Sequence, residues 1–164
     1  MIARCGPFSR DDRGAAGAEM ALMLPIMLAL FFVSFEAGHY FYTEHKIVKS
    51  VRQGARYAGR LPFDTYSCPA GIDPAAVSQI QAVTRTGSLD GTVPLIAGWE
   101  NSDITVTMTC ESTTTTGIFQ SNTGGAPVVT VAATASYPSL FGTLTDIDND
   151  AQVVASAQAV VNGI

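Results

Sequence analysis

Glu19 is a single carboxylate at the start of a long apolar run, Met20–Phe35, and Gly14 stands five residues before it. A charge within lipid costs on the order of 2.5–3.5 kcal/mol on scales derived from helix insertion, so such a residue indicates a function that requires it. Gly14 also separates a short charged head from the apolar run. We interpret this arrangement as a processing and assembly signal.

Three cysteines offer disulfide chemistry. Cys5 precedes the apolar run, whereas Cys68 and Cys110 follow it. Two cysteines beyond a membrane segment are typical of one disulfide in an oxidising compartment. It would close a loop of about 40 residues and stabilise the fold by roughly 3–4 kcal/mol on the chain-entropy model. Two reduced, buried thiols are the alternative, and Cys5 would remain a reduced thiol in the head segment.

Three carboxylates at alternating positions, Asp146, Asp148 and Asp150, resemble the opening of a calcium-binding loop. Ala151 replaces the turn glycine of such a loop, and Ala157 stands where the closing glutamate belongs. An irregular calcium site and a solvated acidic turn both fit this pattern, and the solvated turn is the interpretation we prefer.

Residues for enzymatic catalysis are scarce. Both histidines, His39 and His45, lie directly after the apolar run, so no Ser–His or Cys–His pair can form within the domain that follows. No glycine-rich phosphate loop and no zinc-ligand spacing occurs. Glu36 and His39 have the spacing of a metal site in helical bundles, but such sites need further carboxylates from facing helices. The sequence therefore favours a non-enzymatic protein without a cofactor.

The sign of the charge divides the chain. Charged residues make up 14 % of the 164 residues and apolar residues 47 %, and eight of the nine basic residues lie at or before Arg60. Nine acidic residues follow Arg60 against one arginine, Arg85, so the C-terminal part carries a net charge of about −8. Because an acidic surface repels phosphate backbones, this charge argues against nucleic-acid binding.

The stretch Ala15–Phe35 has 21 residues and a single charge. As a helix it would be about 31 Å long, enough to cross the hydrocarbon core of a bilayer. A cleaved secretory signal would have a shorter apolar core followed by small residues, but bulky Phe35 stands at that place. We therefore expect a retained membrane helix in contact with lipid.

Basic residues flank this helix almost equally, so charge alone leaves its orientation open. Three precede it and three follow it closely: Arg4, Arg10, Arg13, Lys46, Lys49 and Arg52. The oxidising compartment expected for a disulfide places the N-terminus in the cytoplasm and the C-terminal domain in the periplasm.

The helical pattern continues past the apolar run, so a rod over Ala15–Arg60 is predicted, about 69 Å long. It should stop near Gly59, because Pro62 follows. Pro25 removes one backbone hydrogen bond within lipid, so a kink or a neighbouring helix must compensate. The second half of the rod needs an apolar partner, either its own domain or another subunit.

Three N-terminal stretches resemble the TadE/TadG-like family, small membrane proteins of the tight-adherence pilus machinery. They are Arg13-Gly-Ala-Ala-Gly-Ala-Glu-Met-Ala-Leu-Met-Leu-Pro25, Glu36-Ala-Gly38 and Val51-Arg-Gln-Gly-Ala-Arg-Tyr-Ala58. The family often has Phe or Tyr after the glutamate, where this chain has Met20. The region that they span, Arg13–Ala58, covers about a quarter of the chain.

The resemblance implies a pseudopilin or minor pilin whose leader is cut after Gly14 by a dedicated prepilin peptidase. Ala15 would be the new N-terminus, and its ammonium in one subunit could pair with the Glu19 carboxylate of a neighbour. The alternative is that Glu19 lies at the interface and reaches water. Gly17 is a rival cut site, but a cut there would make Glu19 the second residue, which does not fit this pairing. The other implied partners are pilin or pseudopilin subunits and the pilus assembly platform of the bacterial inner membrane.

The segment after Cys68 is expected to form an α+β domain. Asp73 and Pro74 are a good N-cap and first-turn pair for a helix near Pro74–Thr84, with Gly87 just past its end. The Ser/Thr/Gly-rich segment Glu111–Pro127 is expected to be a mobile loop.

Two runs of alternating apolar residues predict half-buried strands, and a third, Ala-rich run fits either a helix or a strand. The resemblance favours a strand for the third run. The three runs are Ile104–Cys110, Val129–Tyr137 and Val153–Val161. We expect them to form an antiparallel sheet of about three strands with the helices on one face.

These expectations divide the chain into a leader, 1–14, a transmembrane and juxtamembrane helix, 15–60, and an exported domain, 61–164. The leading interpretation is a non-catalytic pseudopilin in the inner membrane, which enters the pilus or primes its assembly. The alternative is an uncleaved, single-pass, membrane-anchored binding module of the cell envelope, with the long loop as its recognition surface.

Overall fold

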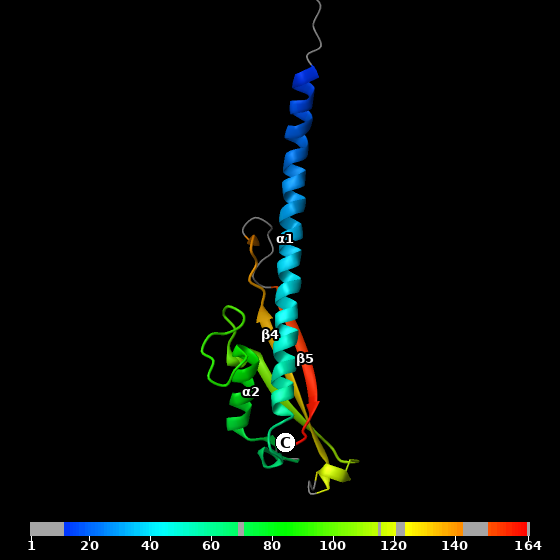
Figure 1. Ribbon diagram of the computed structural model, residues 1–164, viewed down its shortest axis with the longest axis vertical. Helices are drawn as coiled ribbons and strands as arrows, with labels where there is room; N and C mark the ends of the chain where they lie inside the picture. Colours follow the sequence, from blue (N-terminus) through cyan, green and yellow to red (C-terminus); the bar gives the residue numbers. More distant parts are fainter. Residues whose placement is uncertain (1–11, 69–70, 115, 121–123, 143–150, 164) are drawn as a thin grey trace, which may run out of the picture.

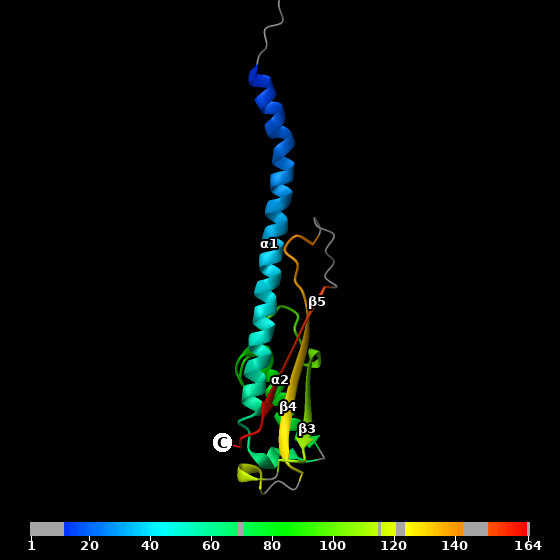
Figure 2. The same cartoon turned by 90° about the vertical axis from the view of Figure 1, so that its right-hand side faces the viewer.

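One long helix, α1 (Asp12–Ala58), forms a rod, and the rest of the chain folds beside its C-terminal half (Figures 1 and 2). The computed structural model describes residues 12–68, 71–114, 116–120, 124–142 and 151–163. The predicted α+β class is confirmed, because a long apolar helix is followed by a small domain with antiparallel sheets.

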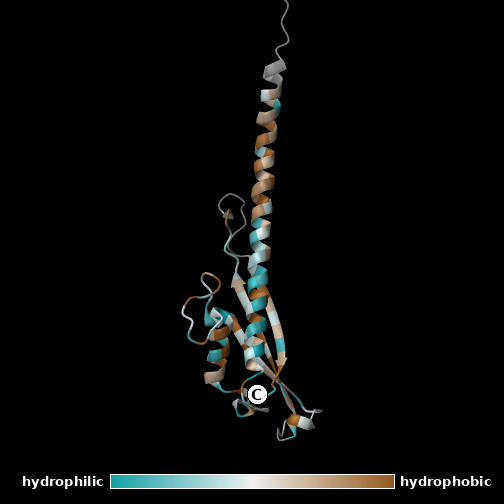
Figure 3. Cartoon of the chain, in the orientation of Figure 1, coloured by the Kyte–Doolittle hydropathy of each residue, from teal (hydrophilic) through white to brown (hydrophobic). Residues whose placement is uncertain are grey.

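The N-terminal half of α1 stands clear of the rest of the described chain except near its end, where Phe32 contacts Phe141. From Ala16 to Phe35 all side chains are exposed except that of Phe32, which is half-buried. Figure 3 shows this half as a nearly continuous hydrophobic band. The helix is long and apolar enough to cross a membrane. It continues without interruption across Pro25 and begins slightly earlier than predicted.

Three antiparallel strands form the main sheet in the order β3-β4-β5. The strands are β3 (Ile104–Glu111), β4 (Ala126–Ser136) and β5 (Gln152–Val160). All three predicted strands are confirmed within a few residues, and the Ala-rich run is a strand. In the register Ile104 faces Ala133, which in turn faces Ala155, so these buried residues line the same face of the sheet.

The Ala-rich composition of β5 allows α1 to lie close to the sheet. A Cβ added at Gly59 would come within 3.0 Å of the Val160 carbonyl oxygen and 3.3 Å of the Ala159 Cβ. The buried α1 residues Ala55 and Ala58 are equally small. Larger side chains at these positions would force the helix away from β4 and β5.

The second helix, α2 (Pro74–Thr86), packs beside α1 and β3 on the same face of the sheet (Figure 1). As predicted, Asp73 caps it, with its carboxylate accepting from the Ala75 amide at 2.8 Å, and Gly87 ends it with φ +84°. The shorter elements were not predicted: η1 (Phe63–Thr65), β1 (Tyr66–Ser67), β2 (Gly71–Ile72), η2 (Asn101–Asp103) and η3 (Gly117–Phe119). The last of these lies inside the predicted long loop.

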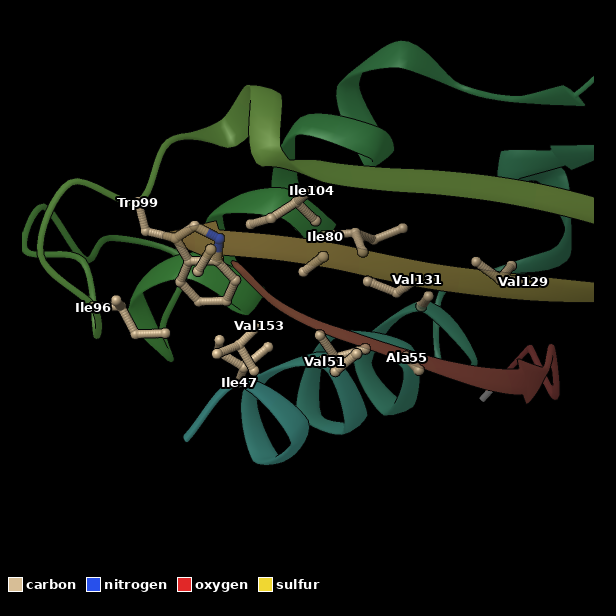
Figure 4. Close-up of a cluster of buried hydrophobic side chains, with 14 of the residues drawn as sticks. Ile47, Val51, Ala55, Ile80, Ile96, Trp99, Ile104, Val129, Val131 and Val153 are labelled. Carbon is tan, nitrogen blue, oxygen red and sulfur yellow. The ribbon is translucent and has the colours of Figure 1, made fainter. Parts of the chain in front are cut away.

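The hydrophobic core lies between the sheet and the C-terminal half of α1 (Figure 4). Ile47 and Val51 of α1 are fully buried, as are Ile80 of α2 and Val129 and Val131 of β4. The chain's own domain is therefore the apolar partner that the second half of the rod requires.

The close packing of α2 against α1 predicts that alanine substitutions at two glycines of α1 differ in their effect on stability. A Cβ at Gly54 would overlap the side chain of Thr84, which is fully buried and donates to the Ile80 carbonyl at 2.7 Å. A Cβ added at Gly38 would meet no neighbouring atom within 4 Å. We expect Gly54→Ala to lower the free energy of unfolding by about 1–3 kcal/mol. Gly38→Ala should be neutral or stabilise by about 0.5–1 kcal/mol.

Chemical unfolding of the full chain in detergent micelles, followed by the fluorescence of the single tryptophan, Trp99, measures both variants. The double variant Gly54→Ala/Thr84→Ala should recover part of the loss. Equal stability of the two single-glycine variants would contradict a close crossing of the helices.

Candidate functional site

Glu36 lies one residue past the apolar run of α1, yet its side chain is only 3 % exposed. Its Oε1 accepts hydrogen bonds from the Tyr137 hydroxyl at 2.8 Å and from the Leu140 amide at 3.2 Å. Its Oε2 accepts one from the Phe141 amide at 3.1 Å. We call these four residues the Glu36 clamp. Bonds to an ionised acceptor are among the stronger hydrogen bonds in proteins.

The clamp joins α1 to the segment that follows β4. Tyr137 comes directly after the strand, and its amide donates to the Ala151 carbonyl at 2.8 Å, next to the start of β5. Pro138 follows and cannot donate to a sheet, so the chain leaves the ladder here. The Glu36 carboxylate gives the amides of Leu140 and Phe141 an acceptor outside the sheet.

Tyr137 is the buried centre of the clamp, with 1 % of its surface exposed. Burial, together with the bond to the Glu36 carboxylate, raises the pKa of Tyr137, so the phenol keeps its proton. His39 Nδ1 lies 3.1 Å from the same hydroxyl oxygen. Because the single phenol proton is donated to Glu36, His39 Nδ1 is the donor in its own bond to Tyr137.

An aromatic contact places the clamp at the end of the apolar run. The rings of Phe32 and Phe141 lie 5.0 Å apart between centroids. Tyr40 packs edge-on against Tyr137 at 5.3 Å. The carboxylate bonds of Glu36 run to the segment after β4, so the arrangement fixes the position of the domain along α1.

The predicted processing residues lie far from the clamp. Gly14 and Glu19 are exposed on the first turns of α1, and Ala15 lies between them in the helix. Glu19 is 17 residues from Glu36, about 25 Å along the helix. Glu19 has no partner among the described residues of this single chain, so a role in assembly stays a prediction.

Cys68 and Cys110 form a disulfide in the structure, with their Cα atoms 6.0 Å apart. It ties the segment after β1 to the last residues of β3, at the end of the domain remote from the apolar half of α1. Gly124 lies against it, since a Cβ there would overlap Cys68.

The possible calcium ligands Asp146, Asp148 and Asp150 lie outside the described residues. Within the part of the chain that the structure describes, no three His, Cys, Asp or Glu side chains form a group that could hold a metal ion. Glu36 and His39, the pair with metal-site spacing, both bond to the Tyr137 hydroxyl instead.

Sequence reasoning missed the clamp. A carboxylate directly after an apolar run and a tyrosine at the end of an alternating strand are the two signals for it, but nothing in the sequence pairs residues 101 positions apart. The burial of Glu36 becomes evident only when the segment after β4 is placed against α1.

Comparison with known proteins gives one finding. The family model described as "TadE-like protein" matches residues 14–56, which confirms the resemblance predicted from the three N-terminal stretches. The matched region contains Gly14, Glu19 and Glu36 and ends before the domain that follows α1. No curated protein and no solved structure matches the chain.

The clamp predicts that Glu36→Ala loosens the segment after β4 from α1. The variant removes the acceptor of three donors, and an unsatisfied buried donor costs about 1–3 kcal/mol. Hydrogen–deuterium exchange at the Leu140 and Phe141 amides of the full-length protein should become about ten-fold faster or more. Tyr137→Phe keeps both amide bonds and should have a smaller effect.

Glu44→Ala is the matched control, because it removes a carboxylate from the same helix outside the clamp. Its exchange at these amides should equal that of the unchanged protein. If Glu36→Ala exchanged at the same rate as this control, the clamp would not hold the segment.

Proposed function

We propose that this chain is a TadE-like membrane pseudopilin or minor pilin that supports assembly of a tight-adherence pilus. The observation that carries the proposal is the family match over residues 14–56. That region contains Gly14, Glu19 and an apolar half-helix whose side chains from Ala16 to Phe31 are all exposed. A surface that is apolar on all sides requires lipid or other apolar helices around it.

The proposed placement is a single pass through the bacterial inner membrane, with the N-terminus in the cytoplasm and the domain in the periplasm. The disulfide between Cys68 and Cys110 supports this orientation, because disulfides persist in oxidising compartments. The helix that could span a membrane supports the anchoring.

The proposed role is structural rather than catalytic. The buried carboxylate of Glu36 accepts three hydrogen bonds from its own chain. The partners in this role are a prepilin peptidase, other pilin or pseudopilin subunits and the membrane platform that assembles the pilus. The protein requires no cofactor for this role.

Glu19 has a partner in this proposal only after processing. Cleavage after Gly14 creates an ammonium at Ala15, and the Glu19 carboxylate of a neighbouring subunit can pair with it. Because an unpaired charge is costly within lipid, the pair favours a defined register between neighbouring helices.

The first prediction from this proposal concerns the mature N-terminus. In cells with an active prepilin peptidase, intact-mass and N-terminal peptide analysis should find a chain that starts at Ala15. A chain that starts at Ala18 would assign the cut to Gly17. Retention of Met1 would contradict processing and favour the uncleaved membrane-anchored binding module.

The second prediction concerns Glu19. Glu19→Ala should leave membrane insertion intact or improve it, since it removes a charge that costs on the order of 2.5–3.5 kcal/mol in lipid. It should impair pilus assembly, counted as filaments per cell by electron microscopy.

Two controls sharpen the Glu19 experiment. Glu19→Asp keeps the charge and should retain part of the assembly, whereas Glu44→Ala removes a carboxylate from the same helix and should assemble fully. Normal piliation in the Glu19→Ala strain would remove the role assigned to Glu19.

A further inference from the structure

The C-terminal half of α1 carries three cations on the face opposite its core. Lys49, Arg52 and Arg56 are exposed and follow one another at steps of three and four residues, which aligns them on one side of a helix. The buried residues Ile47 and Val51 lie on the opposite side. We call the three cations the basic stripe.

Nothing in the described chain neutralises the basic stripe. No carboxylate of the described residues forms an ion pair with Lys49, Arg52 or Arg56 within 4 Å. Their side chains instead line a shallow groove of about 480 Å³, together with His45, Val48 and Gln53. The groove is open to a partner from outside the chain.

The loop after α2 stands at the same level along α1 as the basic stripe. Lys46 Nζ donates to the Leu95 carbonyl at 3.2 Å, and Gln53 Nε2 donates to the Gly87 carbonyl at 2.9 Å. Figure 1 shows this loop beside the lower half of α1. Asp90 within the loop and Glu100 just after it are both exposed. We call these two residues the acidic loop.

Membrane insertion gives every copy of the chain the same depth and direction. The apolar half of α1 must match the thickness of the bilayer, so neighbouring copies stand parallel with little vertical offset. The basic stripe of one copy then meets the acidic loop of the next copy at a common height. Within one chain the two patches form no ion pair.

We propose that the basic stripe binds the acidic loop of a second copy of this chain, side by side in the membrane. The two surfaces are different patches, so the contact is heterologous and can repeat from copy to copy. The inference rests on the membrane placement in the proposed function, and it names this chain itself as one lateral partner. It does not depend on leader processing.

Lipid phosphate is a poor partner for the basic stripe. Arg52 stands 17 residues past Phe35, about 25 Å beyond the apolar run along the helix. The polar headgroup layer adds only about 5–8 Å on each side of the hydrocarbon core. Nucleic acid is also disfavoured, because nine acidic residues and one arginine follow Arg60.

The test uses the full-length chain in vesicles of zwitterionic phosphatidylcholine, so that the lipid carries no net charge. Two populations with a donor and an acceptor fluorophore report association through energy transfer at fixed protein-to-lipid ratio. We expect Arg52→Glu/Arg56→Glu to weaken association about ten-fold at low salt, because the attraction between the two patches becomes repulsion. Asp90→Lys/Glu100→Lys should weaken it equally.

Combining the two pairs of substitutions in one chain exchanges the signs of both patches and should restore association. Asp64→Lys/Glu111→Lys is the matched control, since it changes the charge by the same amount near the other end of the domain. It should leave association unchanged. About 0.5 M salt should weaken association of the unchanged protein by screening.

The proposal is overturned if the variants with one altered patch associate as well as the control. It is also overturned if the variant with all four substitutions fails to regain association while its circular dichroism spectrum is unchanged. Association that persists equally in every variant would assign the contact to the apolar half of α1. Because the vesicles contain neither peptidase nor other pilus components, the result is separate from the outcome of the processing and piliation experiments.

Discussion

A single continuous helix must satisfy two different environments. Along residues 16–35, α1 is exposed except at Phe32 and apolar except at Glu19 and Ser34, whereas from Ile47 onward it has one buried face and one charged face. A helix is a stiff rod. The position along α1 where the apolar run ends therefore fixes the distance between that run and the domain. Its rotation is set by the same residues, since Ile47 and Val51 must face the sheet.

The Glu36 clamp stands at this boundary. The carboxylate accepts from a side chain and two backbone amides, so it binds both the end of β4 and the turn after it. The contact between Phe32 and Phe141 extends the attachment by one helical turn toward the apolar run. The domain is therefore held to α1 at two distant places, by the clamp near the apolar run and by the core along β4 and β5.

The two helices and the first two long strands were predictable from the sequence, because their signals are local. Alternation identified the strands at Ile104 and Val129, and Asp73 and Gly87 bracketed α2 through capping chemistry. The β5 assignment needed the family resemblance, since alanines suit both helix and strand. The clamp was not predictable, because the bond from Tyr137 to Glu36 depends on how separate elements pack. The sequence shows which residues are charged. It does not show that the basic stripe and the acidic loop lie at the same level along α1, which follows from the hydrogen bonds of Lys46 and Gln53 to the loop.

The packing of the first helix against the last strand has a consequence for how the chain reaches its fold. β5 lies at the C-terminal end of the chain, yet it covers residues of α1 that are synthesised about 100 residues earlier. Contacts between residues so distant in sequence form slowly, because a long loop must close first. The core face of α1 therefore stays partly uncovered until β5 has been synthesised. During that interval the incomplete domain exposes an apolar surface, while it is joined to an apolar half-helix that is long enough to cross a membrane.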